Sequence, residues 1–120
     1  MNAVWQPSGL VILACLGGAV AYAQPGAPTA ADVDAGKRIY ASNCAQCHGP
    51  EGLGDGEAGK GLSPPPADVA RSSKLPIATD AYLYWTIAEG GAPVGSAMPP
   101  FKTVLDETRI SQVVAYLRGL

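Results

Sequence analysis

Two cysteines and a histidine stand within five consecutive residues, where Cys44 and Cys47 enclose two residues and His48 follows at once. A structural zinc site needs four ligands, yet His48 is the only histidine and the third cysteine, Cys15, lies in an apolar leader. A thioredoxin-like pair would follow a strand in an alternating α/β pattern, which is absent here. A plain exported disulfide would leave His48 beside it by chance.

The same spacing, C-x-x-C-H, is the signature of covalent haem attachment. Two thiols at this spacing can reach the two vinyl groups along one edge of a porphyrin, and the adjacent imidazole is carried beneath the ring to the iron. We therefore predict one covalent haem c, attached through Cys44 and Cys47, with His48 as an iron ligand.

The second axial position of the iron needs a ligand from elsewhere in the chain. Met98 is the only methionine besides Met1, and it stands in the Gly/Pro-rich stretch GGAPVGSAMPPF rather than in a helical pattern. A methionine in a helix at apolar spacing would be core filler. The loop position instead favours Met98 as the second ligand.

The N-terminal stretch differs from the rest of the chain in charge and hydrophobicity. No Asp, Glu, Lys or Arg precedes Asp32, an apolar run ends at Tyr22, and Ala-Tyr-Ala at 21–23 matches a cleavage site. Residues 1–23 are therefore predicted to be a signal peptide or, since the leader lacks a basic residue, an uncleaved membrane anchor; lipidation at Cys15 is a weaker alternative. Residues 24–32 are predicted to be a flexible linker and 33–120 the domain, located in the periplasm or an equivalent exported space.

Composition limits the remaining possibilities. The chain has 120 residues, a net charge of −2, 48% hydrophobic residues, 15 glycines and 11 prolines. This describes one small, loop-rich domain. The charges are scattered, so nothing indicates binding to nucleic acid. Contact with a membrane is expected only if residues 1–23 are retained.

Three helices are predicted, and no strand. Asp32 or Asp34 can cap a helix that runs to about residue 45, and Asp80 can cap one over residues 81–89 that ends at Gly90. Asp106 can cap a third, in which apolar residues recur at i, i+3, i+4 and i+7 from residue 110. Residues 56–76 are punctuated by Pro and Gly and predict an extended loop with at most one short helical turn.

Three stretches together resemble the class I c-type cytochromes, over most of residues 33–119. They are GKRIYASNCAQCHG, with Gly36, Tyr40 and Cys44 at four-residue intervals, SAMPPF around the methionine, and ISQVVAYLRGL at the end. The resemblance implies an all-α cytochrome c fold, with three main helices and long loops wrapped around one covalent haem. It also implies that Gly36 and Tyr40 cross the last helix at residues 113, 116 and 117.

Further contacts around the haem are predicted. The resemblance implies that a backbone carbonyl of Pro64, or of Pro65 or Pro66, accepts the proton of the far nitrogen of His48. Haem propionates need hydrogen bonds or charge partners, for which Tyr84, Trp85 and, more weakly, Arg71 are candidates; Trp85 has plain core packing as its alternative. The residues expected to pack on the haem are Leu53, Leu62, Leu83, Trp85, Ile87 and Phe101.

With both axial positions filled by the chain, the iron has no open site, and no nucleophile stands beside a base. The sequence therefore predicts a one-electron carrier rather than an enzyme, docking transiently on redox proteins at an uncharged haem edge framed by residues 45, 46, 92–94 and 97. One alternative is a haem subunit of a dehydrogenase or oxidase complex. Another is a sensor or peroxidase-like protein in which Met98 leaves the iron. A cytochrome c prime is disfavoured because its haem motif lies near the C-terminus.

Overall fold

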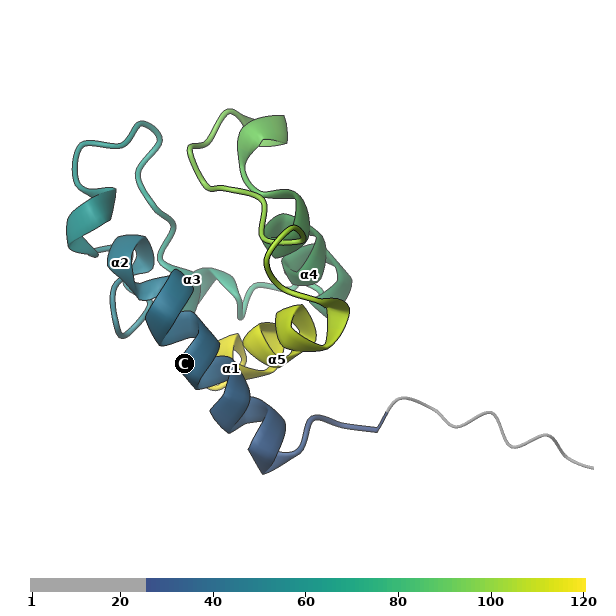
Figure 1. The fold of residues 1–120 in the computed structure, drawn as a ribbon. Coiled ribbons are helices and arrows are strands. Elements are labelled where there is room, and N and C mark those ends of the chain that lie inside the picture. The colour runs from purple at the N-terminus through teal and green to yellow at the C-terminus, as the bar shows by residue number, and fades with distance from the viewer. Residues whose placement is uncertain (1–25) are drawn as a thin grey trace, which may run out of the picture.

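The computed structural model describes residues 26–120, so the predicted leader 1–23 lies outside the described residues. Within them every regular element is helical: α1 (Ala30–Asn43), α2 (Ala45–His48), the 3-10 helix η1 (Glu57–Gly59), α3 (Val69–Ser72), α4 (Asp80–Glu89), the 3-10 helix η2 (Ala92–Val94) and α5 (Glu107–Leu117). Three helices, α1, α4 and α5, dominate the domain (Figure 1). None of the helices over residues 26–120 is long and apolar enough to cross a membrane.

The first helix begins earlier than predicted. Thr29 is its N-cap, and its hydroxyl accepts from the Asp32 backbone N–H at 3.2 Å while the Asp32 carboxylate accepts from the Thr29 N–H at 3.0 Å. This reciprocal capping box satisfies two free donors at once, which neither Asp32 nor Asp34 alone would do. The predicted caps were wrong, and residues 30–32 of the predicted linker are helical.

The other two main helices follow the same capping chemistry. Thr79, not Asp80, caps α4, because its hydroxyl accepts from the Tyr82 N–H at 3.1 Å. Gly90 ends α4 with a φ of 74°, as predicted. Asp106 caps α5 as predicted, accepting from the Arg109 N–H at 2.9 Å. The stretch over residues 56–76 contains two short turns, η1 and α3, where at most one was predicted.

Helices α1 and α5 cross at close range, as predicted. A Cβ atom added to Gly36 would stand 1.9 Å from the Gln112 carbonyl oxygen and 3.0 Å from the Tyr116 Cβ, so only glycine lets the two backbones meet. The Tyr40 and Tyr116 rings pack 5.3 Å apart between centroids. The buried core lies on this joint, with Tyr40, Ile110 and Val113 at 1–2% exposure.

Two loop regions rise from one side of the helix joint (Figure 1). The first, residues 44–67, is called here the cysteine arm and contains α2 and η1. The second, residues 90–101, is called the methionine arm and contains η2. The joint therefore serves as a base that carries two arms facing each other.

Candidate haem site

A cavity of about 440 Å³ lies between the two arms, with α4 and α5 at its base. Cys44, Cys47 and His48 line it from the cysteine arm, and Met98 lines it from the methionine arm. The structure thus brings all four predicted attachment and iron-binding residues to one cavity. The remaining lining is mostly apolar, and no Asp, Glu, Lys or Arg contributes to it.

The two thiols are placed by the junction between α1 and α2. The Cys44 N–H donates to the Tyr40 carbonyl at 2.8 Å, and the His48 N–H donates to the Cys44 carbonyl at 2.9 Å, so the motif continues the helical path of α1. Both cysteines are free and partly buried. Burial, with a smaller contribution from Cys47, raises the pKa of the Cys44 thiol to about 11. The free Cys44 thiol is therefore protonated at neutral pH.

The His48 ring is oriented by a backbone carbonyl. Its Nδ1 lies 2.9 Å from the Ala67 carbonyl oxygen. A carbonyl oxygen can only accept, so Nδ1 carries the proton and Nε2 keeps a lone pair, the tautomer that binds a metal. The acceptor belongs to the residue after the proline run rather than to Pro64, and Pro64, Pro65 and Pro66 line the cavity instead.

Two glycines after the C-x-x-C-H motif donate hydrogen bonds to the carbonyls of its last two residues. The Gly54 N–H donates to the His48 carbonyl at 2.8 Å, and the Gly56 N–H donates to the Cys47 carbonyl at 3.0 Å. A Cβ on Gly54 would stand 2.6 Å from the Pro66 carbonyl oxygen, and one on Gly56 would stand 2.4 Å from the Gln46 carbonyl oxygen. The chain therefore folds tightly under α2 because glycine leaves room for it.

Met98 is half-buried in the wall of the cavity. The Gly91 N–H donates to its carbonyl at 2.8 Å. Gly90, with a φ of 74°, passes close to the Met98 carbonyl oxygen, which would stand 2.7 Å from an added Cβ. The end of α4 thus fixes the backbone that carries the thioether.

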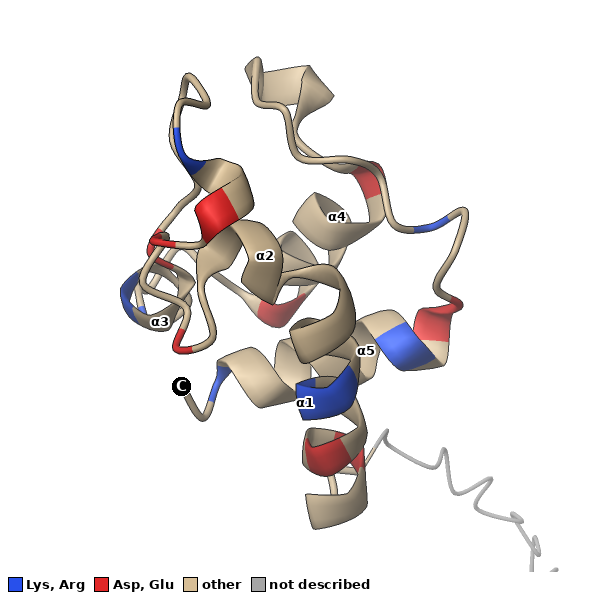
Figure 2. Ribbon diagram, turned by 60° about the vertical axis from the view of Figure 1, so that its left-hand side comes forward, with Lys and Arg blue, Asp and Glu red and all other residues tan. Residues whose placement is uncertain are grey.

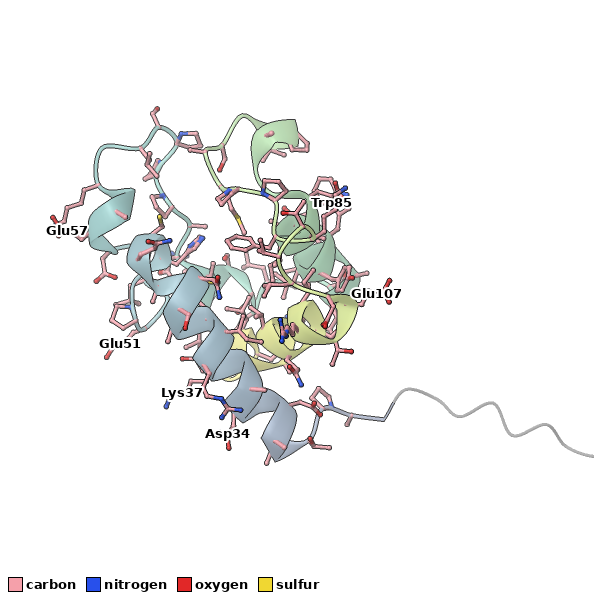
Figure 3. All side chains as sticks on the ribbon, viewed as in Figure 1. Asp34, Lys37, Glu51, Glu57, Trp85 and Glu107 are labelled. Carbon is pink, nitrogen blue, oxygen red and sulfur yellow. The ribbon has the colours of Figure 1, made fainter. Side chains whose placement is uncertain are left out.

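Several predicted haem neighbours lie elsewhere. Trp85 is 42% exposed and projects from the outer side of α4, where its ring lies 6.4 Å from that of Tyr82 (Figure 3). Tyr84 packs against the buried core, and Arg71 is exposed on α3. None of these three lines the cavity, so their contacts with propionates stay predictions.

Among the residues expected to pack on the haem, Leu62, Leu83, Ile87 and Phe101 line the cavity, whereas Leu53 does not and is 50% exposed. Tyr82 also lines it, a position that sequence reasoning missed. The signal was present, because Tyr82 and Thr86 repeat the i, i+4 spacing of Leu83 and Ile87 one residue earlier on the same helix.

The groups around the cavity fit a haem. Iron in haem takes imidazole and thioether ligands, and a cavity of this size lies in the range of small-molecule sites, about 300–1,000 Å³. Over residues 26–120 no three His, Cys, Asp or Glu side chains gather as a metal site, so a zinc ion would have no ligand set there. The rim segments 61–67 and 90–101 are free of charged residues, which lie at other points of the surface (Figure 2).

A family model and two relatives that match this chain all describe subunits of cbb3-type cytochrome c oxidases. Residues 31–117 match the family model described as cytochrome C oxidase, cbb3-type, subunit III. The chain is 33% identical over 91 residues to the cbb3-type cytochrome c oxidase subunit CcoP of Azospirillum brasilense, covering 76% of this chain and 29% of that protein. It is 34% identical over 94 residues to the subunit FixP of Sinorhizobium medicae, covering 73% and 30%. The chain therefore spans less than a third of the length of these relatives.

A solved structure shares the fold. A chain of the reducing HAO-like protein complex of Kuenenia stuttgartiensis superposes with a TM-score of 0.65 at 25% identity, covering 81% of this chain and 47% of that chain. The superposition therefore includes most of this chain and about half of the Kuenenia stuttgartiensis chain.

Proposed function

The chain belongs to the family of cbb3-type cytochrome c oxidase subunit III, and from this premise we propose that it is the haem-bearing electron-transfer subunit of an oxidase or dehydrogenase complex. The observation that carries the proposal is the shared cavity, in which two thiols and an imidazole on one arm face a thioether on the other. The family match makes the chain a cytochrome c domain, whose chemistry is electron transfer through haem.

Each residue has a defined task in this proposal. The Cys44 and Cys47 thiols would each add across a vinyl group, sulfur bonding to one carbon and the thiol hydrogen going to the other. His48 would bind the iron through Nε2, since Nδ1 is held by the Ala67 carbonyl. Met98 would hold the sixth position through its sulfur. When bound, the haem supplies a one-electron Fe(III)/Fe(II) couple.

The subunit assignment is favoured over a free carrier by the relatives, because both are named as subunits of an oxidase. The chain spans less than a third of the length of these relatives, so the proposal concerns electron transfer by this domain and not the activity of the whole proteins. We place the domain in the periplasm, with its redox partner docking on the uncharged rim of the cavity. No residue of the site is assigned a catalytic role of its own.

Attachment and ligation are tested separately. After acid–acetone extraction, haem should stay with the protein, whereas Cys44→Ser with Cys47→Ser should release it into the organic phase; Ser111→Ala, at an exposed position of α5, is the control. Release from the unmodified chain would refute covalent attachment. The mature mass should begin at Gln24, while a mass that retains residues 1–23 would indicate an anchor.

Met98→Ala tests the closed iron site. Loss of the thioether should abolish the sulfur-to-iron charge-transfer band of the oxidised protein, lower the reduction potential and admit carbon monoxide to the reduced protein, with haem attachment intact. An unchanged spectrum and potential would remove Met98 as a ligand and favour the sensor or peroxidase-like alternative. Carbon monoxide binding by the unmodified protein at neutral pH would do the same.

The subunit assignment is tested by purification from native membranes. The haem-bearing chain should elute with an oxidase or dehydrogenase in size-exclusion chromatography. Elution as a single chain of about 12.2 kDa or its processed form would instead establish the free carrier.

A further inference from the structure

The methionine arm is closed at its stem by the last turn of α4. The Phe101 N–H donates to the Ile87 carbonyl at 3.0 Å, and the Lys102 N–H donates to the Ala88 carbonyl at 3.2 Å. These are carbonyls at a helix end, which have no partner within the helix. Both ends of the methionine arm are therefore attached to α4: the first residue, Gly90, follows the helix directly, and the last residue, Phe101, is hydrogen-bonded to it.

Inside the arm, both polar backbone groups of Met98 have partners. Its carbonyl accepts from the Gly91 N–H at 2.8 Å, and its N–H donates to the Ser96 Oγ at 3.3 Å. The next two residues are prolines, which have no N–H, so Met98 has the last N–H of the arm before Phe101. Of these two bonds, only the one to Ser96 depends on a side chain.

Ser96 is itself held in place by Gly91. The Ser96 N–H donates to the Gly91 carbonyl at 2.9 Å, and the space beside Gly91 is filled by the serine side chain, since an added Cβ would stand 2.3 Å from Ser96 Oγ. Ser96 is partly buried and lines the cavity beside Met98. Its hydroxyl therefore has one defined position, next to the N–H of the ligand residue.

We propose that Ser96 is a positioning residue for the sixth iron ligand: its hydroxyl, seated against Gly91, fixes the Met98 backbone and so keeps the thioether on the iron. The proposal rests on ligation by Met98. Its consequence is kinetic, because the frequency with which Met98 leaves the iron sets how fast an outside ligand can enter.

Ser96→Ala tests this contact with little change of shape. The oxidised holoprotein is mixed with imidazole, and the rate of disappearance of the sulfur-to-iron band is followed. Loss of one hydrogen bond should raise the rate about two- to tenfold. Ser96→Thr, which keeps a hydroxyl, should restore the original rate. Ser111→Ala, an exposed serine on α5, is the matched control.

Gly91→Ala tests the same contact from the other side, since the new Cβ would stand 2.3 Å from the Ser96 Oγ and 2.6 Å from the Ser96 Cβ and must displace the serine side chain. It should raise the imidazole rate as Ser96→Ala does. Rates equal to those of the unmodified protein in both variants would overturn the proposal, as would a Ser96→Thr variant as fast as Ser96→Ala. Absence of the band from the unmodified protein would instead refute Met98 ligation, which separates the two claims.

Discussion

The helix joint and the two arms are held together by different forces. At the α1–α5 joint, Tyr40, Ile110 and Val113 are 1–2% exposed, and the helices meet through packed side chains. In the arms, Leu62 and Val94 are 37% and 67% exposed although both line the cavity, and the chain is fixed by backbone hydrogen bonds through glycines. The joint therefore has its own hydrophobic core, whereas Leu62 and Val94 in the arms would gain burial from a group bound in the cavity.

Tyr40 connects the two regions. Its ring packs in the joint against Tyr116, while its hydroxyl donates at 2.7 Å to the carbonyl of Gly49, the residue after His48. The arm that carries His48 is thus tied to the core by this buried hydrogen bond. This residue offers a way to loosen one region without the other.

The largest expected effect comes from breaking the joint. In Gly36→Leu the side chain would begin 1.9 Å from the Gln112 carbonyl oxygen, so the helices must separate, and we expect a loss of about 3 kcal/mol in the free energy of unfolding of the holoprotein. Denaturant unfolding followed by circular dichroism measures it. Ala41→Leu, at an exposed position of α1, is the control and should change little. An unchanged midpoint for Gly36→Leu would mean that the helices do not meet there.

Tyr40→Phe should loosen the arm while keeping the joint. The ring stays, but the Gly49 carbonyl loses its buried donor, at a cost of about 1.5 kcal/mol. Hydrogen exchange should speed up at Gly54 and Gly56 more than at Val113. Equal acceleration at all three amides would contradict the separation of the two regions.

Tyr40→Phe should also change how the stability of the protein depends on pH. Burial raises the pKa of Tyr40 above its ordinary value of 10.0, so the unfolded chain loses this proton first as the pH rises. The contribution of Tyr40 to stability is therefore complete below about pH 10 and declines above it. The stability of Tyr40→Phe should fall less steeply than that of the unmodified protein between pH 10 and 11. Parallel curves would argue against a buried, protonated hydroxyl.

The smallest effect is expected at the exposed start of α1, outside the buried core, where Asp32 accepts from the Gln112 side chain of α5 at 3.1 Å. Thr29→Ala removes the capping box with Asp32 and should cost about 1 kcal/mol, measured as a shift of the thermal midpoint. Thr29→Ser keeps the hydroxyl and should stay close to the original midpoint. Imidazole binding to the haem iron should not change, and a faster rate would show that the cap influences the methionine arm.

The regions also differ in how far sequence predicts them. The α5 face was predictable because its spacing follows the helical period, whereas the crossing at Gly36 was predicted from the resemblance to the class I c-type cytochromes. The cap at Thr29 was missed because a hydroxyl and a carboxylate three residues apart are equally good cap candidates in a sequence.

In the arms, residue types were predictable but partners were not. The motif and Met98 indicated haem chemistry, yet the acceptor of the His48 proton is Ala67, nineteen residues away, and its identity depends on how the loop turns after three prolines. The roles of Gly54 and Gly56 likewise depend on distant carbonyls. No periodicity encodes such contacts.

The position of the capping box also determines how the domain can be attached to anything that precedes it. Residues 26–29 enter at the end of α1 that points away from both arms (Figure 1). A tether joined ahead of Gly26 would hold the domain from behind, leaving the uncharged mouth of the cavity turned outward.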